Sequence, residues 1–259
     1  MSIRLDSDGI QVMRAQHQQF ETLCASAVTY DDLKNIVDTY IKYITEGKYL
    51  LMGFVRPVYN KWIGWGIPSN DAIEFIVGGF LQYKKKYSNA RLIDFGAGTG
   101  CTTLFLREKL MQLGSDATVI PIDLVNPTHI PGKEFIDIIK INNVSAAPKP
   151  SDSDYERCQE RQVGSIDSFE FQRDDVLLVV WGAGCDTAIA ECVTKYGIGC
   201  VIIQGERDGG CTYSIETFEC ANGWSVCYSK PIPSAVSIFE TITINTRRAG
   251  VCVTGDIPT

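Results

Sequence analysis

The residues best suited to binding chemistry lie in one short segment, Asp94-Phe95-Gly96-Ala97-Gly98-Thr99-Gly100. An apolar run leads into the acid, and a helical pattern follows the last glycine. This order predicts a glycine-rich turn at the point where a buried strand passes into a helix. Because glycine has no Cβ and reaches positive φ freely, a ligand can lie directly against the backbone of such a turn.

The spacing of the glycines separates two classes of nucleotide-like ligand. A dinucleotide site requires the pattern G-x-G-x-x-G, with a pyrophosphate at the N-terminus of the following helix. Here Gly96, Gly98 and Gly100 are followed by Cys101, so the third glycine of that pattern is missing. A dinucleotide oxidoreductase is therefore the weakest of the functions considered.

Two acids flank the turn in an arrangement that suits a ligand without phosphate. Asp94 precedes the turn, where a carboxylate suits a cationic amino group better than a pyrophosphate. Asp123 closes the next predicted strand, where it can accept hydrogen bonds from both hydroxyls of a ribose. A ligand with an ammonium group and a ribose but no phosphate is S-adenosylmethionine, which we predict as the cofactor.

The elements that must position these residues follow from hydrophobic periodicity. Residues 7–48 are expected to be helical, with an N-cap at Thr29, and to form either a lid or a layer packed on the sheet. We expect an irregular ordered loop over 51–69, helices over 70–87, 101–113 and 187–196, and a long surface loop over 126–162. Strands are expected at 90–95, 117–122, 175–181, 199–204, 224–228 and 241–246.

This alternation of strands and helices predicts a doubly wound parallel sheet with an antiparallel ending. Ligands of such sheets bind at the carboxyl ends of the strands. Four residues fall at predicted strand ends and are expected to converge on one crevice: Asp94, Asp123, Trp181 and Glu206.

The segment from Asp94 to Gly100 resembles the first motif of class I S-adenosylmethionine-dependent methyltransferases, and Asp123 resembles their second-strand acid. The resemblance covers about residues 65–248. Short segments at Ile67-Pro68-Ser69, Gly205-Glu206 and Gly209–Thr212 resemble a poorly characterised subgroup of these enzymes. The resemblance implies an α/β, Rossmann-like, seven-stranded and mostly parallel sheet with helices on both faces. A helical extension over 1–68 would precede a cofactor-binding domain over 69–259.

The same resemblance implies roles for individual residues. Asp94 and the turn would approach the methionine part of the cofactor, Asp123 would hold the ribose, and Leu124 would pack on the adenine. Trp181 would flank the methyl group, with a core tryptophan as the equal alternative. Asp167 is a weak candidate for the acid that these enzymes carry after the third strand. The turn residues that would contact the cofactor are Gly96, Ala97, Gly98 and Gly100.

The methyl acceptor is much less evident. Related enzymes that methylate nucleobases or glutamine carry Asn/Asp-Pro-Pro-Tyr/Phe after the fourth strand, whereas this chain has Trp181-Gly182-Ala183-Gly184-Cys185-Asp186. Glu206 is a candidate base or amine-orienting group, or else a ligand for nearby backbone amides. Tyr59, with Trp62 and Trp65, would either wall an acceptor pocket or pack on the sheet. Two functions follow: a methyltransferase acting on a small molecule or protein side chain, or an inactive binding or scaffold protein on the same fold.

Composition limits the partners and the compartment. The 259 residues carry a formal net charge of −7, which argues against a general nucleic-acid binder. The ten cysteines form no C-x-x-C pair and only two histidines are present, so we expect no structural metal site. No signal peptide or membrane span is evident, and free thiols fit a reduced cytoplasm, including that of an infected host. The sequence indicates no oligomeric state.

Overall fold

A computed structural model describes residues 7–124, 136, 139–141, 169–182, 186–206, 223–232 and 240–247. The predicted loop over 126–162 lies largely outside these residues, and so do Asp167 and Gly209–Thr212. The helices are α1 (Ser7–Ser26), α2 (Tyr30–Thr45), α3 (Tyr49–Trp62), α4 (Asn70–Lys86), α5 (Cys101–Gln112) and α7 (Asp186–Tyr196). The strands are β1 (Leu92–Phe95), β2 (Val119–Leu124), β3 (Ile139–Ile141), β4 (Val176–Val180), β5 (Cys200–Glu206), β6 (Trp224–Pro231) and β7 (Glu240–Arg247).

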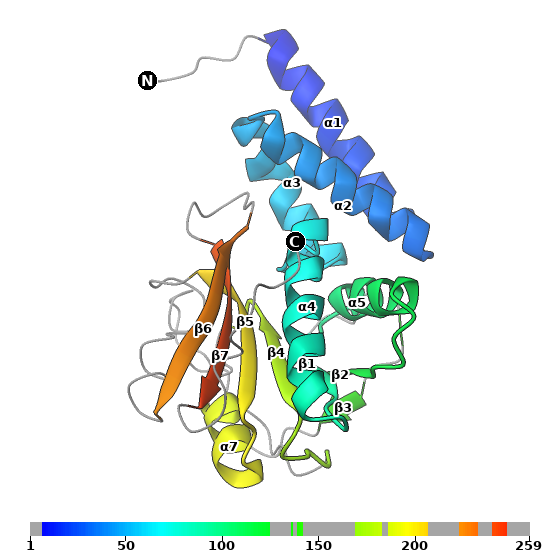
Figure 1. The fold of residues 1–259 in the computed structure, drawn as a ribbon. Helices are drawn as coiled ribbons and strands as arrows, with labels where there is room; N and C mark the ends of the chain where they lie inside the picture. The colour runs from blue at the N-terminus through cyan, green and yellow to red at the C-terminus, as the bar shows by residue number, and fades with distance from the viewer. Residues whose placement is uncertain are drawn as a thin grey trace.

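The strands form one sheet in the order β3-β2-β1-β4-β5-β7-β6 (Figure 1). Strands β1 to β5 pair in parallel, whereas β7 is antiparallel to both β5 and β6. The predicted α/β fold with a mostly parallel sheet and an antiparallel ending is therefore confirmed. In this order the carboxyl ends of β1, β2, β4 and β5 lie along one edge of the sheet, and β7 begins at that edge.

Helices cover both faces of the sheet. Along β4, Val176 and Leu178 join a core that includes α1 to α5, whereas Leu177 and Val179 join a second core against α7. This alternation follows from the two-residue period of a strand, and a strand buried on both faces reads as a continuous apolar run. The position of α7 on the opposite face completes the doubly wound arrangement predicted from the sequence.

The N-terminal helices extend the first core. Thr29 caps α2 as predicted, because its hydroxyl accepts the Asp32 N–H while the Asp32 carboxylate accepts the Thr29 N–H. Tyr40 of α2 has no exposed surface and stacks on Tyr59 with ring centroids 4.4 Å apart. These helices lie at one end of the molecule, beyond α4 (Figure 1). Residues from all three helices are buried in this core, which fits the alternative of a packed layer.

The predicted irregular loop over 51–69 is wrong for its first part, because Tyr49–Trp62 forms the helix α3. Pro57 lies inside this helix and cannot donate a backbone hydrogen bond, and Gly53 has a low helix propensity. Burial outweighs both costs, since one face of the helix packs in the core. That face comprises Leu51, Met52, Val55, Val58 and Tyr59. The chain is irregular only from Ile63 to Ser69, where the Ser69 hydroxyl accepts the Ala72 N–H and starts α4.

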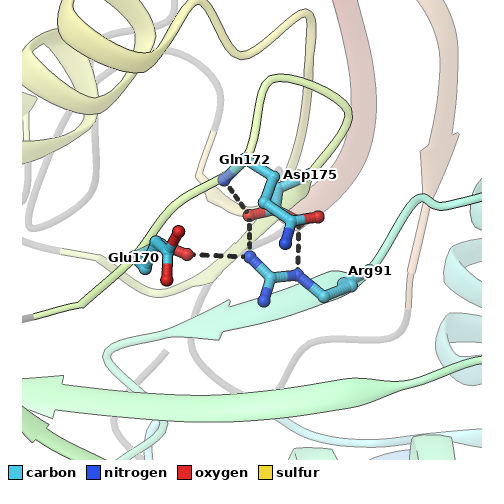
Figure 2. Close-up of polar contacts among 4 residues, drawn as sticks. All are labelled: Arg91, Glu170, Gln172 and Asp175. Atoms are coloured by element: carbon cyan, nitrogen blue, oxygen red, sulfur yellow. Dashed lines mark hydrogen bonds and ion pairs between the residues drawn. The ribbon is translucent and has the colours of Figure 1, made fainter.

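A buried ion pair joins the amino-terminal ends of two central strands (Figure 2). The Arg91 guanidinium donates to both oxygens of the Asp175 carboxylate, at 2.8 and 2.7 Å, and to the Glu170 carbonyl at 3.0 Å. The Gln172 N–H donates to the same carboxylate at 2.8 Å. Asp175 has no exposed surface, so these bonds replace its hydration. The pair thus fixes β1 beside β4 at the edge of the sheet opposite the glycine turn.

Among the helices in the described part of the chain, none is long and apolar enough to cross a membrane.

Candidate cofactor and acceptor site

The glycine turn lies between β1 and α5, as the sequence predicts. Gly96, Gly98 and Gly100 have φ values of 81°, 60° and 80°, which L side chains rarely adopt. A Cβ placed on Gly96 or Gly98 would meet no other atom within 4 Å, so open space lies beside this backbone. The amides of Gly96 and Ala97 donate to the Ile122 carbonyl, at 2.8 and 3.0 Å. The turn is thus held against β2 and presents bare backbone to a ligand.

The structure brings Asp123 to this turn. Its carboxylate accepts the Gly98 N–H at 3.1 Å, and the side chain is partly exposed. The predicted meeting of the second-strand acid with the glycines is therefore present in the fold. A partly exposed carboxylate beside open backbone fits the ribose end of S-adenosylmethionine, because ribose hydroxyls need an acceptor at this edge.

Asp94 lies beneath the turn rather than on its surface. It is 1% exposed, and its carboxylate accepts a hydrogen bond from the Thr103 hydroxyl of α5. Burial raises the pKa of Asp94 to about 6, the Thr103 hydrogen bond opposes this rise, and the Asp123 charge adds to it. Asp94 thus ties the end of β1 to the first turns of α5. Its predicted contact with the cofactor amino group stays a prediction.

The turn is also tied to the chain that follows α3. The Thr99 hydroxyl, which is almost fully buried, donates to the Ile63 carbonyl. This hydrogen bond holds the start of the irregular segment, Ile63 to Ser69, beside the glycine turn. No periodicity in the sequence indicates it, because it joins two irregular segments.

Trp181 follows β4 directly and has a backbone conformation that is uncommon for a bulky residue. Its φ is 52°, in the left-handed region, which costs about 1–3 kcal/mol for a side chain of this kind. Two hydrogen bonds hold it there: its N–H donates to the Gln204 carbonyl at 2.9 Å, and its indole N–H donates to the Glu240 carboxylate at 2.8 Å. The Gln204 side chain donates to the same Glu240 oxygen at 3.2 Å.

Trp181 is half-buried within an aromatic and cationic cluster. Its ring stacks on that of Trp65, with centroids 6.4 Å apart and planes 29° apart. The Arg56 guanidinium lies 5.4 Å from the Trp181 ring centroid and 5.9 Å from that of Trp65. It also donates to the Trp65 carbonyl at 2.7 Å and to the Tyr40 hydroxyl at 3.3 Å. We call Arg56, Trp65, Trp181, Gln204 and Glu240 the tryptophan cluster.

The sequence missed three members of this cluster, namely Arg56, Gln204 and Glu240. Two of them carried a signal, because Gln204 is a polar residue in an apolar strand and Glu240 begins another strand. Both are almost fully buried, and a buried polar side chain needs a partner. Arg56 carried none, since it lies on a helix that was predicted as a loop.

The remaining predicted residues differ in where they lie. Tyr59 has no exposed surface, and its hydroxyl donates to the Gly66 carbonyl at 3.2 Å. Burial raises the pKa of Tyr59 well above its usual value. This location fits packing better than a role as a pocket wall or catalytic group. Glu206 ends β5 and Leu124 ends β2, but the side chains of both lie outside the described residues.

Within the described ranges, no group of three or more His, Cys, Asp or Glu side chains is placed to hold a metal ion.

Comparison with models of known protein families finds no match, and neither does comparison with curated protein sequences. Solved structures of WbdD, one described as a bifunctional kinase-methyltransferase, are similar at 12–13% identity with TM-scores of 0.39–0.40. The chain spans only about 40% of the length of those structures, and 69% of it is covered. Magnesium protoporphyrin IX methyltransferase from Synechocystis PCC 6803, solved with bound SAM, is similar at 10% identity with a TM-score of 0.36. That likeness covers 86% of this chain and 99% of the other. Both proteins are thus methyltransferases by description. These identities and TM-scores are too low to assign a function to this chain.

Proposed function

We propose that this protein is an S-adenosylmethionine-dependent methyltransferase acting on a small molecule or a protein side chain. The observation that carries the proposal is the joint placement of the glycine turn and Asp123. The turn presents open backbone, and the carboxylate is bonded to that turn at the carboxyl edge of a doubly wound sheet.

Each part of this site has a role in binding. Gly96 and Gly98 let the cofactor approach the backbone, and Asp123 accepts hydrogen bonds from the ribose hydroxyls. Asp94 supplies negative charge beneath the turn, which favours the cationic methionine end. When bound, S-adenosylmethionine supplies an electrophilic methyl group on a sulfonium. The residues around it then have to orient the acceptor and exclude water, and Trp181 and Trp65 offer apolar faces for both tasks.

Isothermal titration calorimetry with S-adenosylmethionine tests the proposal directly. We expect saturable binding by the wild type and clearly weaker binding by Asp123→Ala. Circular dichroism and thermal unfolding would establish that the variant is folded. No binding by the folded wild type would overturn the proposal, and so would unchanged binding in Asp123→Ala.

The second candidate is a cofactor-binding or scaffold protein without turnover. It is favoured by the sequence after β4, where Trp181-Gly182-Ala183-Gly184 replaces the proline-containing motif of related amine methyltransferases. Formation of S-adenosylhomocysteine with any acceptor would exclude it. Binding without product, across primary amines, thiols, hydroxyls and proteins from a cell extract, would favour it.

A further inference from the structure

The two oxygens of the Glu240 carboxylate differ in their hydrogen bonding. Oε1 accepts the indole N–H of Trp181 and the amide N–H of Gln204, at 2.8 and 3.2 Å. Oε2 is shielded from solvent and accepts no hydrogen bond from any residue that the structure describes. The residue as a whole is 2% exposed. A buried carboxylate oxygen without a donor is costly and calls for an explanation, because the two oxygens together can accept about four hydrogen bonds.

The location of Glu240 connects it to the proposed site. It begins β7 and pairs with Glu206, the last residue of β5, so it lies at the carboxyl edge of the parallel strands. Its Oε1 holds Trp181, the residue that follows β4, and β4 is the neighbour of the strand that ends in the glycine turn. Glu240 is therefore joined by one hydrogen bond to the residue expected beside the transferred methyl group.

The surroundings of Glu240 suit a nitrogen that donates hydrogen bonds and gains positive charge as it reacts. The rings of Trp65 and Trp181 already lie beside one cationic side chain, that of Arg56. Aromatic faces together with a carboxylate favour cations, particularly where water is excluded. The Arg56 guanidinium donates to the Tyr40 hydroxyl and the Trp65 carbonyl, and these two hydrogen bonds do not involve Glu240.

We propose that Oε2 of Glu240 accepts a hydrogen bond from the nitrogen of a neutral amine methyl acceptor and orients it toward the cofactor. The nitrogen lone pair then forms the new bond to the methyl carbon as the C–S bond breaks and S-adenosylhomocysteine leaves. The proton that the nitrogen loses passes to Oε2. This inference rests on the proposed function and deepens it, because it assigns the class of acceptor. The strained backbone of Trp181 has a role in the same arrangement, because it places the indole N–H where it donates to Oε1 and fixes the carboxylate.

A pair of cofactor analogues tests this without knowledge of the natural acceptor. In sinefungin a carbon that bears an amino group replaces the sulfonium and its methyl, so the amine stands where the transferred methyl would lie. S-adenosylhomocysteine has neither the methyl nor the amine. We expect the wild type to bind sinefungin at least tenfold more tightly than S-adenosylhomocysteine by calorimetry. Glu240→Gln should lose most of this preference and bind S-adenosylhomocysteine within about twofold of the wild type. Glu74→Gln, an exposed acid on α4 paired with Lys109, is the matched control and should keep the preference.

The outcomes separate the two proposals. Binding of neither analogue by the wild type would refute cofactor binding itself. Equal binding of both analogues by the wild type, or a preference that survives in Glu240→Gln, would refute the role of Glu240 alone. If Glu240→Gln does not fold, Glu240→Asp keeps the charge but withdraws it by one methylene, and an unreduced preference in that variant would also count against the proposal.

Discussion

The backbone N–H of Gly98 lies 3.1 Å from the Asp123 carboxylate, and this bond joins the glycine turn to the end of the neighbouring strand. The two residues are 25 positions apart in the chain, and the parallel pairing of β1 with β2 brings them together. The Asp123 carboxylate therefore holds the turn, and under the proposed function the same carboxylate would accept the ribose hydroxyls.

Replacement of Asp123 should affect cofactor binding more than folding. We expect Asp123→Ala to weaken S-adenosylmethionine binding by about 10- to 100-fold, because each lost charge-assisted hydrogen bond is worth about 1.5–3 kcal/mol. Asp123→Asn keeps one acceptor oxygen, and its affinity for S-adenosylmethionine should lie between those of the wild type and Asp123→Ala. Calorimetry measures the affinities, and Asp116→Ala, an exposed acid before β2, serves as the control. Equal affinity in all four proteins would contradict the assignment of Asp123 to the ribose.

Asp94 should make the protein less stable as the pH rises through about 6. The folded state raises its pKa from 3.8 to about 6, so the folded protein binds the proton more tightly than the unfolded chain. The stabilisation is complete below about pH 4 and is lost as the carboxyl ionises in the core. We expect Asp94→Asn to raise the free energy of unfolding at pH 7 by about 1–3 kcal/mol. Its amide oxygen still accepts the Thr103 hydroxyl.

Urea unfolding of both proteins at pH 4 and pH 7 measures this effect. The gain from Asp94→Asn should be present at pH 7 and nearly absent at pH 4, where wild-type Asp94 is protonated. Cofactor affinity should fall in the same variant, because the negative charge beneath the turn is gone. If Asp94→Asn were less stable than the wild type at pH 7, the ionised Asp94 carboxylate would be stabilised by neighbouring groups, and the prediction would be wrong.

The ion pair between Arg91 and Asp175 should govern stability without affecting the cofactor. Among the residues that the structure describes, Arg91→Met leaves the fully buried Asp175 carboxylate with one donor, the Gln172 N–H. We expect a loss of about 2–4 kcal/mol in the free energy of unfolding. Adding Asp175→Asn should recover part of that loss, because the uncompensated charge is removed. Chemical unfolding of the two single variants and the double variant completes a cycle. Additive losses would mean that the two groups do not interact, and weaker cofactor binding in the folded variants would contradict the separation of this pair from the site.

The features predicted from sequence are those in which local backbone geometry or periodicity leaves little choice. The three alternate glycines require a turn with positive φ, and the apolar runs around 93, 120, 178 and 202 can only be buried strands. The cap at Thr29 depends on residues within three positions. Parallel pairing then brings Asp123 to the turn, so the cofactor end of the site follows from the order of elements.

The tryptophan cluster could not be predicted in this way. Its members come from α3, the segments after α3 and β4, and the strands β5 and β7. The contact between Arg56 and Trp181 joins residues 125 positions apart. The helix that carries Arg56 was itself missed, because Pro57 and the neighbouring glycines and aromatics obscure its period. Contacts between residues far apart in the sequence determine the structure of this cluster, and local propensities do not predict such contacts.

Two helical glycines should respond oppositely to alanine. Gly53 in α3 has no atom within 4 Å of a built Cβ, so Gly53→Ala should raise the free energy of unfolding by about 0.5–1 kcal/mol through helix propensity. A Cβ on Gly79 of α4 would lie 2.2 Å from Cδ1 of Ile244 on β7, and Gly79→Ala should cost about 1–3 kcal/mol. Chemical unfolding measures both effects. The steric cause is tested by Ile244→Val, which removes Cδ1: in that background Gly79→Ala should cost much less than in the wild type. An undiminished cost would mean that α4 and the sheet do not approach as closely at this point as the structure shows.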